Sequence, residues 1–227
     1  MLLRPNAPPH DHLVPAGARV ALRLRPRGFT LLEIMVVVGL IAVLSAMSLT
    51  AYEDLTARAT FSSVLGNLVT SLRQTRIESA GRGVATAFIV DTQHNRWWGI
   101  EAPTGWSVGG FDPSNPGTVI VSGVFPTGSG KAEFGPPTGL GVALQAPLAS
   151  VPVVSSQNPA LPYCSFCNPD TGMGAIIFSP SGSASFSGSA VSARVLGQQF
   201  TIRSPPDART VLIAVAARSG WVEVVEP

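Results

Sequence analysis

The chain has 227 residues, of which 45% are hydrophobic and only 12% are charged, and its formal net charge is +2. This length suggests one or two domains. The charge is unevenly placed: residues 1–28 hold five arginines and one aspartate, whereas the remainder carries ten basic and twelve acidic side chains. Without residues 1–28 the chain is mildly acidic, so it has no general electrostatic basis for binding nucleic acid.

An apolar segment follows the basic N-terminal region. The 21 residues FTLLEIMVVVGLIAVLSAMSL, from Phe29 to Leu49, contain one charged side chain, Glu33. At about 1.5 Å per residue they form a helix of roughly 32 Å, long enough to cross a hydrocarbon core. Basic residues precede this span and Glu53 and Asp54 follow it, which favours a cytoplasmic N-terminus and an external C-terminal part. This segment fits a secretory signal peptide less well, because the apolar region of such a signal is usually shorter, roughly 7–15 residues.

Glu33 is the unusual residue of this segment. A carboxylate in the apolar part of a membrane helix costs a few kcal/mol unless it is paired. One interpretation is that it reaches the nearby interface. The other is that cleavage between Gly28 and Phe29 creates a new α-amino group, and that the amine of a neighbouring copy, shifted along the axis, pairs with Glu33. A buried charge that only another subunit satisfies favours assembly.

The sequence RGFTLLEIMVVVGLIAVLSA resembles the class III signal of type IV pilins and type II secretion pseudopilins. That signal is a basic leader ending in Gly, then an aromatic residue, Thr-Leu-hydrophobic-Glu and an apolar helix. The resemblance implies cleavage after Gly28 by a prepilin peptidase, N-methylation of Phe29, and Glu33 as the partner of a neighbour's N-terminus. Methylation keeps the amine charged. The leader is long and contains proline, which departs from the family and leaves the translation start open.

The helix is expected to continue beyond the apolar segment. Five residues at spacings of three and four form one stripe along this helix, namely Phe61, Leu65, Leu68, Leu72 and Thr75. Gly81 and Gly83 suit a helix end. We therefore predict one helix from Thr30 to Ala80, whose first half meets lipid or sister helices and whose second half packs on a domain.

From residue 84 onward the pattern changes to the period of two that is typical of strands. Strands are expected at residues 84–90, 96–101, 106–108, 118–124, 141–146, 175–179, 199–203, 209–216 and 220–225. Clusters of Gly, Pro, Ser and Asn separate them. Several short strands without a second long helix indicate antiparallel sheets packed as a sandwich. The Pro- and Gly-rich residues 126–173 are expected to form a long loop.

The predicted fold class is α+β, with a long N-terminal membrane-spanning helix packed on an antiparallel β-sandwich-like C-terminal domain. Four parts are expected: a cleaved leader at 1–28, a transmembrane and assembly helix at 29–52, an amphipathic periplasmic helix at 53–83, and a periplasmic β-rich domain at 84–227.

The C-terminal part resembles the GspH/FimT group of minor pseudopilins. The similar segments are LRQTRIESAGRGVATAFIV, AIIFSPSGSASF and RTVLIAVAARSGWVEV. Some members of this group bind DNA through basic residues near the end. Here the tail SGWVEVVEP carries Glu223 and Glu226, a departure that counts against DNA uptake.

Cys164 and Cys167 form a CxxC motif. A zinc site needs two further ligands, and His94 is the only histidine after the leader. A thioredoxin-like role needs a βαβ context, whereas these cysteines lie in a Pro-rich segment. Outside a bacterial inner membrane, the motif favours a small disulfide. The sequence around Lys131 imitates a phosphate loop but lacks its first Gly and its Ser or Thr.

Trp97, Trp98 and Trp221 lie in predicted strands, where aromatic side chains usually belong to the core or to a sheet surface. A sugar- or protein-binding patch is the alternative. The mature chain would keep a single histidine, so nothing indicates a Ser-His-Asp site. We expect no catalytic residues, no metal site and no cofactor.

The expected function is structural rather than enzymatic. The resemblance implies a minor pseudopilin of a type II secretion pseudopilus, or a minor type IV pilin, in the bacterial inner membrane and then in a periplasmic filament. Its expected partners are other pilin or pseudopilin subunits, the prepilin peptidase and methyltransferase, the assembly platform with its ATPase, and membrane lipid. A tip-located binding or DNA-uptake pilin and an unprocessed single-pass membrane enzyme are the alternatives.

Overall fold

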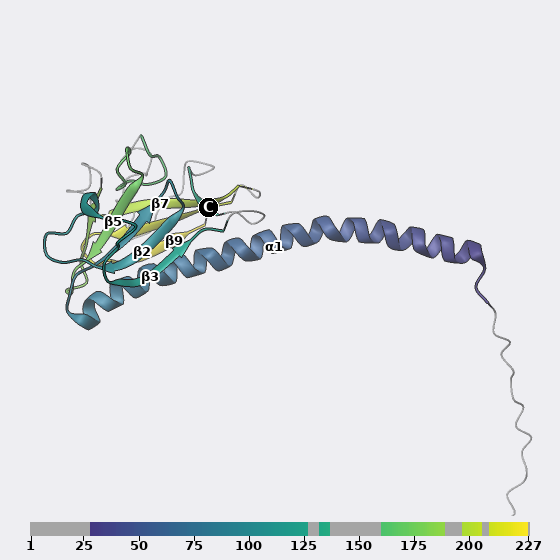
Figure 1. The fold of residues 1–227 in the computed structure, drawn as a ribbon, viewed down its shortest axis with the longest axis horizontal. Coiled ribbons are helices and arrows are strands. Elements are labelled where there is room, and N and C mark those ends of the chain that lie inside the picture. The colour runs from purple at the N-terminus through teal and green to yellow at the C-terminus, as the bar shows by residue number, and fades with distance from the viewer. Residues whose placement is uncertain (1–27, 127–131, 137–159, 189–196, 206–208, 227) are drawn as a thin grey trace, which may run out of the picture. The chain divides into compact units, whose positions relative to one another are not determined.

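The computed structural model describes residues 28–126, 132–136, 160–188, 197–205 and 209–226. The chain divides into two compact units, Met1–Ala46 and Met47–Pro227. One long helix comes first and strands follow (Figure 1), and the bounds are α1 Leu31–Arg82, β1 Thr86–Asp91, β2 Arg96–Glu101, the 3₁₀ helix η1 Val108–Gly110, β3 Val119–Val124, β4 Glu133–Phe134, β5 Met173–Phe178, β6 Ala184–Ser187, β7 Gly197–Ser204, β8 Arg209–Ala216 and β9 Val222–Val225.

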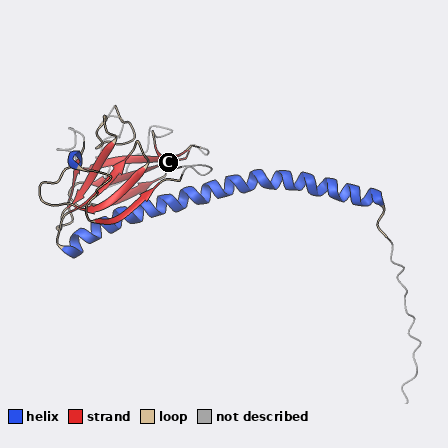
Figure 2. Ribbon diagram, in the orientation of Figure 1, coloured by secondary structure: helices blue, strands red, loops and turns tan. Residues whose placement is uncertain are grey.

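Two sheets follow the helix (Figure 2). The first has five strands in the order β3-β2-β1-β5-β6, and the second has four strands in the order β4-β7-β8-β9. Every pairing between these strands is antiparallel. A long helix followed by antiparallel sheets is the α+β architecture that the sequence predicts.

One hydrophobic core joins the second half of α1 to both sheets. Its largest fully buried members are Phe88, Phe166, Phe178, Phe200, Leu68, Leu72, Ile176, Ile202 and Ile213. On β1, Phe88 and Val90 belong to this core, whereas Ala87 and Ile89 belong to a second cluster. The split follows from the strand geometry, because successive side chains point to opposite faces of a sheet.

The predicted helical stripe is confirmed. All five of its side chains are buried, namely Phe61, Leu65, Leu68, Leu72 and Thr75. The helix ends at Arg82, within two residues of the predicted end. Gly83 follows with φ of +68°, and its N–H donates to the carbonyl of Ser79 at 3.1 Å. This left-handed glycine is a common way to end a helix.

The predicted strand at residues 106–108 is wrong. The N–H of Trp106 donates to the carbonyl of Pro103 at 2.9 Å, and that of Val108 donates to Ser187 Oγ at 3.1 Å, so neither joins a strand ladder. The N–H of Gly110 donates to the carbonyl of Ser107 at 3.2 Å. A turn and η1 therefore replace the strand, and Val108 packs into the second cluster. The predicted strand at 141–146 lies outside the described residues. Two short strands were not predicted: β4 lies inside the segment expected to be a loop, and β6 pairs with β5.

Gly66 offers a test of how the helix contributes to stability. It lies on the exposed side of α1, and a Cβ added there meets nothing within 4 Å. Gly66→Ala should stabilise the Met47–Pro227 unit by about 1 kcal/mol, because alanine loses less backbone entropy in a helix. Thermal unfolding of the detergent-solubilised chain measures it. Gly83→Ala is the matched control and should destabilise, because φ is positive there; shifts of the same sign would contradict this account.

Candidate functional site

Three of the residues that the sequence singles out lie at the N-terminal end of α1 or just before it. Gly28 and Phe29 precede the helix, and the side chain of Phe29 is 76% exposed. Thr30 caps the helix, because its Oγ1 accepts a hydrogen bond from the N–H of Glu33 at 3.2 Å. Glu33 lies in this first turn, where a carboxylate interacts favourably with the helix dipole.

The role of Thr30 as a cap is not among the sequence-based predictions, although a signal for it exists. Thr-Leu-Leu-Glu at residues 30–33 matches the capping-box pattern Ser/Thr-x-x-Glu before an apolar run. The cap fixes where the helix begins. It therefore places the backbone of Glu33 three residues after Thr30, within the first turn.

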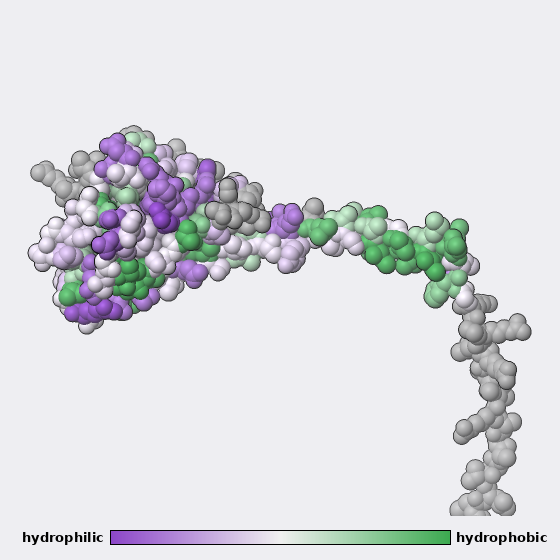
Figure 3. All heavy atoms as spheres, viewed as in Figure 1, coloured by the Kyte–Doolittle hydropathy of each residue, from purple (hydrophilic) through white to green (hydrophobic). Residues whose placement is uncertain are grey.

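The surface of the first part of α1 is apolar on all sides. Every side chain from residue 28 to residue 49 is exposed, and Figure 3 shows hydrophobic residues gathered along this part of the helix. Within the described part of the chain, α1 is the one helix long and apolar enough to cross a membrane. An exposed apolar surface of this size is stable only in lipid or against other apolar helices.

Glu33 is the single charge on this surface. None of the ion pairs among the described residues includes it. The described ion pairs all lie in the Met47–Pro227 unit. Arg82, for example, pairs with Glu78 and Glu101. These two carboxylates raise the pKa of Arg82, mainly through the side-chain hydrogen bond from Arg82 to Glu78.

A disulfide joins Cys164 to Cys167 in the structure. Both cysteines are fully buried. The backbone of Cys164 forms an isolated antiparallel β-bridge with that of Phe200 in β7. Between them, the N–H of Ser165 donates to the carbonyl of Gln199 at 3.0 Å. The ring of Phe166 lies 6.0 Å from that of Phe200. The CxxC segment is thus part of the core beside β7.

Removing this disulfide should lower stability. For a loop this short, the entropy model assigns the cross-link about 2 kcal/mol. We expect the double variant Cys164→Ala and Cys167→Ala to lose about that much free energy of unfolding, measured in urea. Its stability should not respond to reductant, whereas that of the unchanged chain should fall. A reductant effect of equal size in both proteins would contradict the prediction.

The three tryptophans considered as a binding patch, Trp97, Trp98 and Trp221, do not form a common surface patch. Trp97 is 3% exposed and Trp98 is 8% exposed, so the interpretation as core residues is right for both. Their rings contact Phe125 at 5.1 Å and Phe111 at 5.3 Å respectively. Trp221 alone is on the surface.

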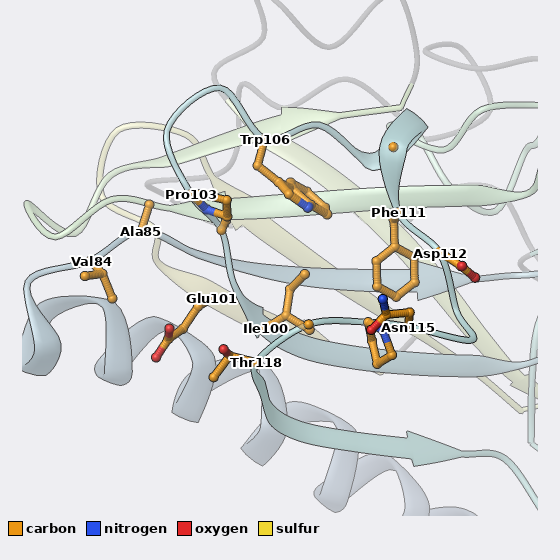
Figure 4. A pocket seen from close by; sticks show the side chains of 14 residues that line it. Val84, Ala85, Ile100, Glu101, Pro103, Trp106, Phe111, Asp112, Asn115 and Thr118 are labelled. Carbon is orange, nitrogen blue, oxygen red and sulfur yellow. The ribbon is translucent and has the colours of Figure 1, made fainter.

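A hollow of about 540 Å³ lies beside the end of β2 and the segment that leads to β3. Figure 4 shows Trp106 and Phe111 on one side of it, with Glu101 pointing towards α1. The carboxylate of Glu101 accepts a hydrogen bond from Arg82 at 2.8 Å, and that of Asp112 accepts one from the N–H of Ser114 at 2.8 Å. Its acidic groups are therefore engaged in local structure and do not converge on a common point.

The fold and the first turn of α1 define a class of protein: a membrane-anchored subunit with one apolar helix and a β-rich domain. Residues 23–49 match the family model described as "Prokaryotic N-terminal methylation motif". The N-terminal part of the chain is thus type IV pilin-like.

Curated relatives support the same assignment. The chain is 35% identical over 83 residues to "Prepilin peptidase-dependent protein D" of Escherichia coli (strain K12), which is 35% of this chain and 51% of that protein. It is 46% identical over 39 residues to "Type IV major pilin protein PilE1" of Neisseria gonorrhoeae, 17% of this chain and 24% of the relative. The "Fimbrial protein" of Neisseria meningitidis serogroup B (strain ATCC BAA-335 / MC58) is also 46% identical over 39 residues, 17% of this chain and 23% of the relative.

The chain therefore spans about half, or less, of the length of these relatives. No solved structure matches the chain. The family model matches residues 23–49, and each of these relatives matches 35% of this chain or less.

Proposed function

We propose that this chain is a minor subunit of a type IV pilin-like filament, of the GspH/FimT group. Its system is a type II secretion pseudopilus or a type IV pilus. One observation carries the proposal: the methylation motif at residues 23–49 places a single carboxylate, Glu33, in the first turn of a helix that is otherwise uncharged and exposed up to residue 49.

Processing comes first in the proposed sequence of events. A prepilin peptidase cuts between Gly28 and Phe29 and removes the leader at 1–28, and the new amine of Phe29 is methylated. Residues 29–52 then anchor the subunit in the inner membrane, residues 53–83 extend the helix into the periplasm, and residues 84–227 form the periplasmic domain. The exposure of Phe29 is compatible with access by such an enzyme.

Assembly then depends on one pair of charges. The Glu33 carboxylate accepts the methylated amine of Phe29 from a neighbouring subunit, because both charges are costly in lipid when they are alone. The work of extracting and stacking subunits is assigned to an inner-membrane platform and its ATPase. This chain contributes binding surfaces and performs no chemistry.

Intact-mass measurement of the chain, extracted from membranes of cells that carry a prepilin peptidase, tests the proposal. We expect the loss of residues 1–28 and the mass of one added methyl group on Phe29. Cells without the peptidase supply the unprocessed standard. A full-length chain in a working assembly would contradict the proposal.

Nucleic acid is not a proposed ligand. The last described strand, β9, carries Glu223, and Glu226 follows it. These carboxylates oppose phosphate binding. A gel shift at two salt concentrations checks this, because binding to phosphates weakens steeply with salt; a strong, salt-sensitive shift would instead favour a DNA-uptake pilin.

A further inference from the structure

We infer that a groove between α1 and β3 receives an extended, uncharged segment of a second polypeptide, which pairs with the edge of β3 that no described strand occupies. The groove has a volume of about 380 Å³, and its lining comprises Val64, Asn67, Thr70, Ser71 and Gln74 of α1, Trp97 of β2, and Val121, Ser122, Gly123 and Val124 of β3. All of these residues belong to the Met47–Pro227 unit.

The edge of β3 supplies the first argument. Among the described strands, β3 lies at the end of its sheet and pairs with β2 alone. The N–H of Phe125 donates to the carbonyl of Asn95 at 2.9 Å, and the register places Gly123 opposite Trp97. Hydrogen-bonded and non-bonded pairs alternate in an antiparallel ladder. The backbone groups of Ser122 and Val124 therefore point away from β2, towards the open edge.

The helix supplies the second argument. Asn67, Thr70 and Gln74 recur at spacings of three and four, so they lie along one side of α1 and line the groove together. All three are exposed, and no hydrogen bond to their side chains occurs among the described residues. They offer amide and hydroxyl groups and no charge. Such a lining can exchange hydrogen bonds with the backbone N–H and C=O groups of an uncharged segment.

Trp97 supplies the third argument. Its ring lies against Gly123, where an added Cβ would overlap the indole. The indole Nε1–H is buried and has no hydrogen-bond partner. An unsatisfied buried donor is unfavourable. A carbonyl brought into the groove, or an Asn67 or Gln74 side chain turned inward by the occupant, would supply the missing acceptor.

These features fit strand addition, in which backbone hydrogen bonds give affinity and alternate side chains give specificity. A second copy of β3 is a poor occupant. Antiparallel pairing of two β3 edges would relate the copies by a two-fold axis perpendicular to the sheet, so the parts of α1 within the two Met47–Pro227 units would run in opposite directions, whereas the subunits of one filament share a direction. A neighbouring subunit of a different kind is the source of the segment, and this part of the inference rests on the proposed function.

Residue-resolved amide hydrogen exchange of the full chain in detergent tests the groove without a filament. The probe is the acetylated and amidated peptide Thr-Val-Ser-Val-Thr at millimolar concentration. We expect the amides of Ser122 and Val124 to exchange about tenfold more slowly with peptide, because they gain hydrogen bonds. The amides of Val121 and Gly123, which already face β2, should not change. Equal exchange of Ser122 and Val124 with and without the peptide would overturn the inference.

Matched variants separate pairing from other binding. Ser122→Pro removes the outward N–H and leaves the bonds to β2, since proline is tolerated on an edge strand; it should abolish the slowing, whereas Ser122→Ala should keep it. Asn67→Arg, on the exposed face of the helix, should also abolish it by filling the groove. Slowing that survives both Ser122→Pro and Asn67→Arg would overturn the inference.

Failure of the groove inference can be told apart from failure of the proposed function. Peptide-dependent slowing in a chain that cells never process would support the groove and reject the filament subunit. Conversely, processed chain recovered in filaments, with Ser122 and Val124 amides that exchange as fast as in the free chain, would reject the groove and keep the filament proposal.

Discussion

Replacing Glu33 by alanine is expected to reduce incorporation of this chain into filaments about thirtyfold. The free subunit exposes a carboxylate on an apolar helix surface, and pairing with a neighbour's amine recovers part of its cost in lipid. If that part is about 2 kcal/mol, its loss weakens the contact between subunits by this factor. The measurement is the fraction of chain in sheared filaments or pseudopili, relative to the fraction left in the membrane.

Three companion variants make the Glu33 result specific. Glu33→Gln keeps the shape and a hydrogen bond but removes the charge, so it should assemble less than the parent and more than Glu33→Ala. Glu33→Asp keeps the charge and should recover part of the assembly. Leu32→Ala, in the same turn and similarly exposed, should have little effect. Normal assembly of both Glu33→Ala and Glu33→Gln would show that charge pairing is not what joins the subunits.

The sequence predicts the helix well because its signals are local. The stripe from Phe61 to Thr75 repeats with the helical period, and Gly83 ends the helix with a conformation that glycine adopts readily. The signal of β1 is equally local, because it is a short apolar run whose residues are buried on both faces of the sheet. These elements need no knowledge of distant partners.

The elements that the sequence misses depend on distant partners. β4 has two residues, and only their pairing with Ile202 and Arg203 of β7 makes them a strand. Conversely, Trp106 to Val108 alternate like a strand, but Trp106 donates its N–H to the carbonyl of Pro103 in a local turn, and Val108 donates its N–H to the side chain of Ser187. The same limit applies to the groove beside β3, since it combines α1, β2 and β3.

The residues of the candidate assembly site, in contrast, can be predicted from the sequence. Gly28, Phe29 and Glu33 stand out in the sequence because they are consecutive or nearly so. The structure adds the cap from Thr30 and the exposure of the helix surface around Glu33. The pairing itself requires a second subunit, so a single chain supplies only one half of the contact.

Gly99→Ala is expected to lower the free energy of unfolding of the Met47–Pro227 unit by about 2 kcal/mol, roughly 4–8 °C in melting temperature. Gly99 lies on β2, and an added Cβ would overlap Thr75 Oγ1 and come within 2.7 Å of Val121. Thr75 cannot easily move, because its Oγ1 donates to the carbonyl of Ser71 at 2.8 Å. The methyl group would therefore push α1 away from the sheet.

A double-mutant cycle with Thr75→Ala shows whether this contact is responsible. Thr75→Ala removes the atom nearest to the new methyl group, so the double variant should be more stable than the sum of the two single changes by about 0.5–1 kcal/mol or more. Thr75→Ser keeps Oγ1 and should give no such recovery. Gly109→Ala, where an added Cβ meets nothing within 4 Å, controls for glycine replacement in the same unit. Each unfolding transition is followed by the near-ultraviolet circular dichroism of the buried tryptophans. Purely additive losses of stability in the cycle would mean that α1 and β2 do not meet at Thr75 and Gly99.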